Sequence, residues 1–92
     1  MYIPNVFSPN ENGANEVFKP LGLLPGISNY QFKIFSRWGQ LVFQSNDPEE
    51  AWNGKINNQG ESCGQGTYFF QVVFQSAAGK TVSKQGTVML LR

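Results

Sequence analysis

The chain contains no histidine and only one cysteine, Cys63. Without histidine it lacks the usual general base at neutral pH and the commonest nitrogen ligand of zinc. Ser–His and Cys–His nucleophile pairs are therefore excluded, and a single cysteine cannot form an internal disulfide. The adjacent carboxylates Glu49 and Glu50 lie in a polar segment that is typical of a solvated surface. The sequence has no metal-ligand cluster and no phosphate-binding loop, so we expect no enzymatic activity and no cofactor.

Charge is also scarce. Seven basic and six acidic residues give a net charge of +1, and neither sign forms a long run. Nucleic-acid binding requires a concentrated basic face, and a membrane-spanning helix requires about 20 consecutive apolar residues. Because the chain has neither feature, we expect no nucleic-acid partner and no membrane insertion of its own.

Aromatic and turn-forming residues are abundant instead. The 92 residues are 14% aromatic and include ten glycines and five prolines. A chain of this length forms one small domain with a thin core, and frequent turn signals favour short strands. The sequence therefore predicts a single all-β domain over residues 1–92, an immunoglobulin-like antiparallel β-sandwich of about six to eight short strands. Strand-like sequence directly after Met1 is typical of a domain excised from a larger protein.

The strongest strand signals lie in residues 30–43 and 66–75. In the first stretch Tyr30, Phe32 and Ile34 alternate with polar residues. Gly39 can supply the positive φ of a tight hairpin turn. A last strand is predicted over residues 81–91, where Gly86 indicates a bulge or a close backbone approach. The expected core residues are Phe32, Ile34, Tyr68, Phe70, Val72 and Val88, with Trp52 closing one end.

A second apolar set falls on the opposite parity of these strands. If the strands share one sheet, its outer face is unusually apolar and can dock another protein. The alternative is that loops or the N-terminal segment cover this face. The set consists of Phe35, Phe69, Val73, Met89 and Leu91.

Residues 10–16 form the candidate ion site. Side-chain oxygens placed around a central glycine, here Gly13, are the ligands that calcium loops use. The same composition also favours a turn stabilised by asparagine side chains, with no ion. The weak calcium candidates are Asn10, Glu11, Asn12 and Glu16.

The aromatic residues allow two interpretations. They can form a stacking platform for a sugar, or they can fill the core of a small domain. Trp38 lies at the predicted hairpin tip, and its exposure bears most directly on which interpretation holds. The residues concerned are Trp38, Trp52, Tyr30, Tyr68 and Phe69.

Six motifs, in order over nearly the whole chain, resemble those of a known family. Phe32-Lys-Ile-Phe-Ser-Arg-Trp-Gly-Gln-Leu-Val-Phe is similar to the signature (F/V)xI(Y/F)NRWGxxVF, with Ser36 in place of asparagine. That signature marks the type B C-terminal domain of the type IX secretion system, also called the gliding motility-associated C-terminal domain of Bacteroidota. The other similar segments are Ile3-Pro-Asn-Val-Phe-Ser-Pro-Asn, Val17-Phe-Lys-Pro, Trp52-Asn-Gly, Gly66-Thr-Tyr-Phe-Phe and Lys84-Gln-Gly-Thr-Val-Met-Leu-Leu-Arg.

The resemblance implies a C-terminal sorting signal for protein secretion. Such a domain directs a fused N-terminal cargo from the periplasm across the outer membrane, through the type IX translocon, to the cell surface or the extracellular space. The implied partners are the translocon and an associated outer-membrane protein. The family has NGDGxND in the candidate ion loop, and the departures at Glu11, Asn12 and Glu16 weaken a calcium site there.

We expect the signal to be a folded surface, because a sandwich brings distant residues side by side. An edge strand can also pair with the partner by β-augmentation. The alternative function is an immunoglobulin-like binding module at the cell surface, for adhesion or for carbohydrate. The candidate partner contacts are Arg37, Trp38, Gly39, Met89, Leu91 and Arg92.

Overall fold

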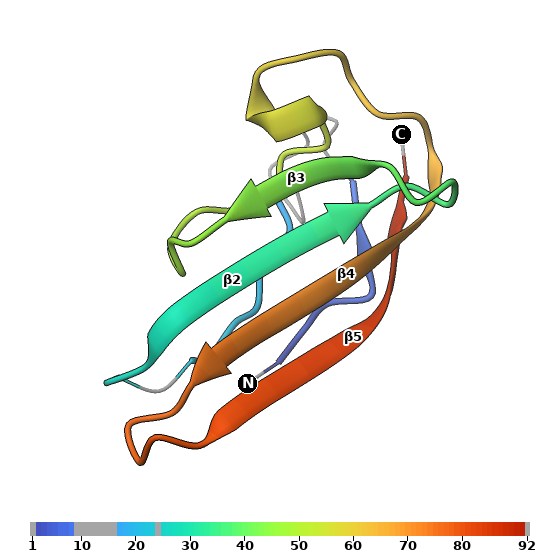
Figure 1. Ribbon diagram of the computed structural model, residues 1–92. Helices are drawn as coiled ribbons and strands as arrows, with labels where there is room; N and C mark the ends of the chain where they lie inside the picture. The colour runs from blue at the N-terminus through green and yellow to red at the C-terminus, as the bar shows by residue number, and fades with distance from the viewer. Residues whose placement is uncertain (1, 9–16, 24, 92) are drawn as a thin grey trace.

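The computed structural model describes residues 2–8, 17–23 and 25–91 of the chain. These residues form one five-stranded sheet with the order β1-β5-β4-β2-β3 (Figure 1). Neighbouring strands are antiparallel except β1 and β5, which are parallel. The strands are β1 (Val6–Phe7), β2 (Ser28–Phe35), β3 (Leu41–Ser45), β4 (Gly66–Gln75) and β5 (Thr81–Leu90).

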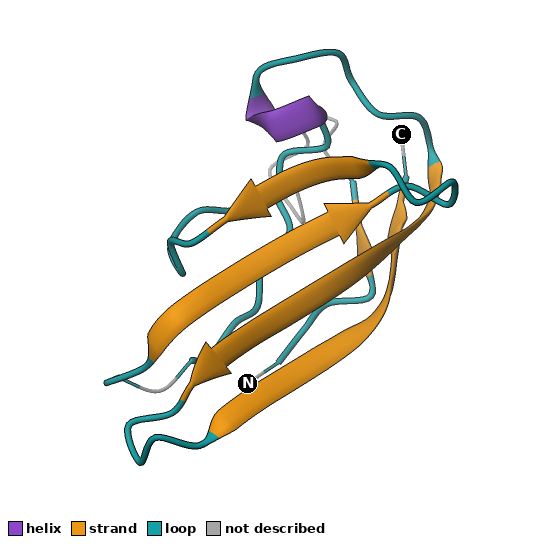
Figure 2. Ribbon diagram, in the orientation of Figure 1, coloured by secondary structure: helices purple, strands orange, loops and turns teal. Residues whose placement is uncertain are grey.

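Helical structure in the described part of the chain is confined to one 3-10 turn, η1 (Ile56–Asn58) (Figure 2). This turn packs beside β3. The all-β prediction is therefore confirmed.

A second layer, made of extended segments, packs against one face of the sheet. Phe18 and Trp52 exchange two backbone hydrogen bonds of 2.9 Å, and Tyr2 and Leu21 exchange two of 2.7 Å. These segments pass behind the sheet in Figure 1. Pro20, between the two bridges, has no N–H and cannot extend the ladder. The sandwich is confirmed, but the described residues hold five strands and isolated bridges where six to eight strands were expected.

The strand order agrees with the immunoglobulin-like prediction. The order β5-β4-β2-β3 is that of the G, F, C and C′ strands of such sandwiches. Near the start of β4, the Tyr68 hydroxyl donates a 2.7 Å hydrogen bond to the Gly64 carbonyl. This is the tyrosine corner of the fold. It ties the loop before β4 to the strand and so fixes the position of that loop at one end of the sheet.

The core between the two layers is largely aromatic. The fully buried Trp52 lies with its ring centroid 5.2 Å from that of Phe7 and 5.2 Å from that of Tyr68. Its indole N–H donates to the Lys55 carbonyl at 2.8 Å, so this side chain joins the second layer to the sheet. All the predicted core residues are buried: Phe32, Ile34, Tyr68, Phe70, Val72 and Val88.

Candidate functional site

The two predicted contact segments lie at one end of the sheet, here called the tip end. The hairpin turn, residues 36–40, follows Phe35, which pairs with Phe69 near the start of β4. The first residue of β4, Gly66, pairs with Leu90 at the end of β5. The turn and the end of β5 therefore lie at the same end of the sheet, with the start of β4 between them (Figure 1). The predicted contacts brought together here are Arg37, Trp38, Gly39, Met89 and Leu91, whereas Arg92 lies outside the described residues.

The hairpin turn is organised by Ser36. Its N–H donates to the Gln40 carbonyl at 2.8 Å, and its carbonyl accepts from the Gly39 N–H at 2.9 Å. Its hydroxyl accepts from the N–H groups of Trp38 and Gln40, each at 3.2 Å. This turn leaves Trp38 84% exposed, with the Arg37 guanidinium carbon 5.4 Å from the ring centroid. The tip thus presents a cation–π pair to solvent.

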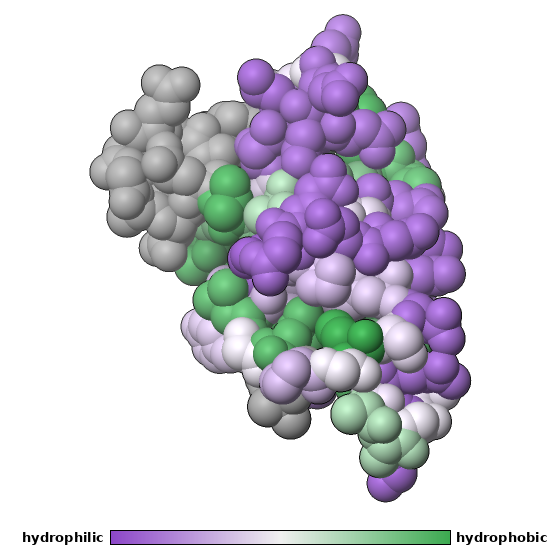
Figure 3. Space-filling view, turned by 90° about the vertical axis from the view of Figure 1, so that its left-hand side faces the viewer, coloured by the Kyte–Doolittle hydropathy of each residue, from purple (hydrophilic) through white to green (hydrophobic). Residues whose placement is uncertain are grey.

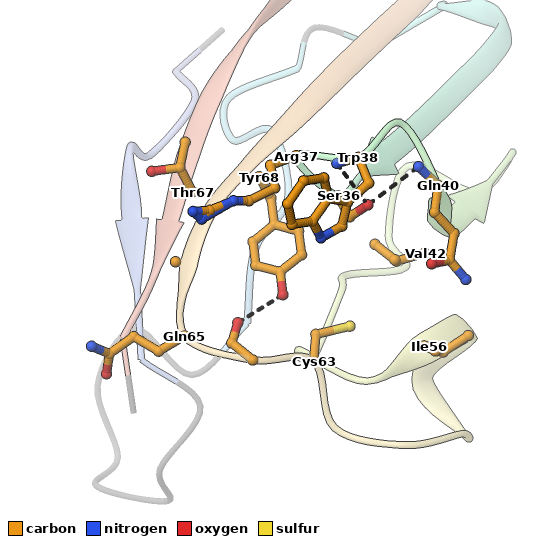
Figure 4. A pocket seen from close by; sticks show the side chains of 12 residues that line it. Ser36, Arg37, Trp38, Gln40, Val42, Ile56, Cys63, Gln65, Thr67 and Tyr68 are labelled. Atoms are coloured by element: carbon orange, nitrogen blue, oxygen red, sulfur yellow. Dashed lines mark hydrogen bonds between the residues drawn. The ribbon is translucent and has the colours of Figure 1, made fainter.

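A cavity of about 380 Å³ lies behind the hairpin turn (Figure 4). The turn forms one wall with Arg37 and Trp38, and the loop before β4 forms another, including the buried Cys63. The Tyr68 hydrogen bond to Gly64 holds that second wall in place. Arg37 is the only charged side chain among the described residues that line the cavity. The cavity therefore offers apolar contacts, neutral hydrogen-bonding groups and one cationic donor, and its described lining holds no Asp, Glu or Lys to pair with Arg37.

Comparison with protein families shows to which family the chain belongs. The CHU_C type IX secretion signal domain matches residues 1–90. The chain belongs to this family. Members of this family act as sorting signals, so the chain is a secretion signal domain for export across the outer membrane. A comparison with curated proteins found no significant match. Within the described residues, the signal domain contains no helix that is both long and apolar enough to span a membrane.

The outer face of the signal domain carries the second apolar set at the predicted parity. Phe69 is 45% exposed and Met89 44% exposed, whereas Phe35 and Val73 are partly buried. The N-terminal strand β1 pairs with the edge of β5 and extends the sheet. In the described part of the chain it therefore lies in the plane of the sheet and does not cover this face.

Of the two interpretations of the aromatic residues, core filling holds for three of the five, which leaves no row of exposed rings for a sugar platform. Trp52, Tyr30 and Tyr68 are buried in the core, at 0%, 5% and 8% exposure. Only Trp38 and Phe69 of the five aromatic residues are exposed, because a domain this small needs its other rings for the core.

The candidate calcium residues, Asn10, Glu11, Asn12 and Glu16, lie outside the described residues. In the described ranges no group of three or more His, Cys, Asp or Glu side chains is placed to hold a metal ion. The calcium site stays a prediction.

A second hollow, of about 420 Å³, lies at the end opposite the tip, where β4 turns into β5. It is lined by Leu23, Ile27, Phe74 and Val82 among others. Figure 3 faces this end of the molecule and shows apolar side chains gathered in its lower half, beneath a hydrophilic upper half. Sequence reasoning did not find either hollow, because both are formed by segments far apart in the chain.

Proposed function

We propose that the signal domain is a non-catalytic sorting signal that is read as a folded surface by the type IX translocon or by an outer-membrane partner protein. The domain carries its fused N-terminal cargo out of the periplasm to the cell surface or the extracellular space. The observation that supports this proposal is the placement of the hairpin turn and the end of β5 at the same end of the sheet.

The tip end depends on the fold for its existence. Residues 36–40, 63–68 and 89–91 are distant in sequence and are brought to the same end of the sheet by the pairing of β2, β4 and β5. A rigid surface loses less conformational entropy on binding than an unfolded tail. Trp38 and Arg37 are of the residue types most enriched at binding hot spots. We therefore place the main contact at this end.

Pairing with an edge strand is a second mode of contact. In the described residues β1 pairs only with Met89 and Leu90, so residues 81–88 of β5 have no strand neighbour on that side. Lys84 on this edge is of a kind that protects edges from pairing with other chains. We therefore assign recognition to side chains at the tip end and not to the backbone of β5.

An export assay tests the proposal. Residues 2–92 are fused behind a signal peptide and a fluorescent reporter, in a host that has the type IX system and the cognate partner. We expect the reporter on the surface or in the medium. A folded domain whose reporter stays in the periplasm would overturn the proposal.

Two variants separate recognition from folding. Trp38→Ala should lower the exported fraction and leave the melting temperature unchanged, because the side chain is 84% exposed. Trp52→Ala should lower both, because it empties the core. Export of the Trp38→Ala variant at the wild-type level would remove the hairpin turn from the recognition surface.

A further inference from the structure

Charge is segregated in the signal domain. Residues 28–45 and 66–91 comprise β2 to β5 and their two hairpin turns, and they contain no Asp or Glu. All acidic residues of the chain lie in the other segments. The main sheet is therefore positively charged although the net charge of the chain is only +1. The basic residues of these two segments are Lys33, Arg37, Lys80 and Lys84.

An apolar row crosses the outer face of the sheet close to the tip end. Phe35 pairs with Leu41 on one side and with Phe69 on the other, and opposite residues in a ladder share a face. Met89 lies diagonally beside Phe69, two residues beyond its partner Thr87 in β5. Leu41, Phe69 and Met89 are 41%, 45% and 44% exposed. We call these four residues the outer row.

The outer row ends sharply along the strands. Two positions further from the tip, the same face carries Lys33 and Gln71, which pair with each other. On this face, the pair across β4 and β5 that follows Phe69 and Thr87 is Gln71 with Gln85. Apolar residues are thus concentrated in the half of the face that adjoins the tip, with Val73 as the exception in the polar half.

The surroundings of the outer row match a protein interface. Phe35 and Phe69 form one side of a shallow hollow of about 470 Å³, with Gln71, Gln85 and Thr87 on its other sides. Interfaces are enriched in aromatic residues, Met and Arg, are depleted of Lys, Asp and Glu at their core, and have a polar rim. Lys33 borders the row on its polar side, and Arg37 lies in the turn beyond its other side.

We infer that the outer row docks onto a protein of the export machinery whose surface is apolar at its centre and bordered by carboxylates. Opposite charges at the border of an apolar contact select the partner and speed association. The inference rests on the proposed function and extends its recognition surface from the hairpin turn onto the sheet.

Phe69 gives the first test, in the export assay at low expression so that the machinery is not saturated. Phe69→Thr keeps a residue that favours strands and should reduce export by about tenfold, as for a hot spot. Phe69→Glu should reduce it further than Phe69→Lys, because only glutamate is repelled by the partner's carboxylates. Val73→Thr is the matched control on the same strand and face, and its export should stay within about twofold of wild type.

Lys33 gives a second test that does not disturb the apolar row. Lys33→Glu should reduce export, whereas Lys80→Glu makes the same charge change in the turn between β4 and β5, at the opposite end of the sheet, and should not. Equal export of the two variants would overturn the charge argument. Thermal melting of each purified domain verifies that it is folded.

The outcomes separate this inference from the proposed function. If the wild-type fusion is not exported, the proposed function fails. If the wild-type fusion is exported and Phe69→Glu is exported equally well, only the outer row is excluded. Loss of self-association in sedimentation, or loss of binding to vesicles of anionic phospholipid, by a Phe69→Glu variant that is still exported would assign the row to a second copy or to a lipid surface and overturn the inference.

Discussion

Gly86 of β5 lies directly opposite Phe70 of β4, and the missing side chain leaves room for the phenyl ring. A Cβ atom at position 86 would lie 3.1 Å from both Cε2 and Cζ of that ring. We expect Gly86→Ala to lower the free energy of unfolding by about 1–3 kcal/mol, the usual effect of overpacking, as measured by urea denaturation.

Gly64→Ala is the matched control, because a Cβ atom there meets no atom within 4 Å. Its effect should stay within about 0.5 kcal/mol. Equal losses for the two variants would show that the Phe70 ring is not the cause.

The Tyr30 hydroxyl is buried and has no hydrogen-bond partner in the described part of the chain. Burial, together with the negative charge of Asp47, raises the pKa of Tyr30 well above its usual value near 10. At neutral pH the phenol is uncharged in both the folded and the unfolded states. We therefore expect Tyr30→Phe to leave the free energy of unfolding unchanged or to raise it, since it removes an unpaired polar group.

The same group makes the fold sensitive to alkali. Above about pH 10 the unfolded chain loses the Tyr30 proton while the folded chain keeps it. The contribution of Tyr30 to the free energy of unfolding is therefore fully present below that pH, and it is lost as the pH rises towards the higher pKa of the folded state. Tyr30→Phe should remove this part of the alkaline loss, as measured by urea denaturation of both proteins at pH 7 and about pH 11. A stability loss for Tyr30→Phe at pH 7 would show that the hydroxyl is bonded.

The two tryptophans differ in surroundings, which gives a spectroscopic prediction. Trp52 is fully buried and Trp38 is 84% exposed. We expect the Trp38→Phe variant to emit at a shorter wavelength and to resist acrylamide quenching, and the Trp52→Phe variant to do the opposite. Trp52→Phe also leaves the Lys55 carbonyl without its indole donor, so it should lower the free energy of unfolding by about 1–3 kcal/mol. Similar quenching of both variants would contradict the exposure of the hairpin tip.

The sequence predicted the parts of the fold that depend on alternation within a strand. Period-two patterns in residues 30–35 and 66–75 place Phe32, Phe70 and Val72 inside and Phe69 outside, as observed. The irregularity in the β2–β3 register was not predicted. It buries both Val42 and Phe43, although neighbours in a regular strand face opposite sides.

Features that depend on contacts between distant segments were also not predicted from the sequence. Alternation says which side a residue faces and does not say which residue lies opposite. The tyrosine corner at Tyr68, the parallel pairing of β1 and the segregation of charge onto the sheet emerge only when the strands are placed in order. The predicted contacts at Trp38 and Met89 were brought to one end of the sheet by that order.

The hydroxyl of Ser36 has a counterpart at the far end of the sheet, which gives a matched pair of variants. Ser36 accepts from the Gln40 N–H at 3.2 Å, and Ser76 accepts from the Lys80 N–H at the same distance. Each turn also has a glycine with φ above +80° three residues after the serine. We expect Ser36→Ala and Ser76→Ala each to lower the free energy of unfolding by about 0.5–1.5 kcal/mol, the usual net contribution of such hydrogen bonds to stability.

Only Ser36→Ala should also reduce export, because the Ser36 hydroxyl positions the Trp38 backbone and Ser76 lies at the opposite end of the sheet. Urea denaturation and the export assay on the same two proteins separate a stability effect from a recognition effect. If both variants lose export in proportion to their stability, the hairpin turn contributes folding and not recognition. Ser36→Asn, the residue of the similar family signature, should restore export, because its side-chain carbonyl can accept the same two N–H groups.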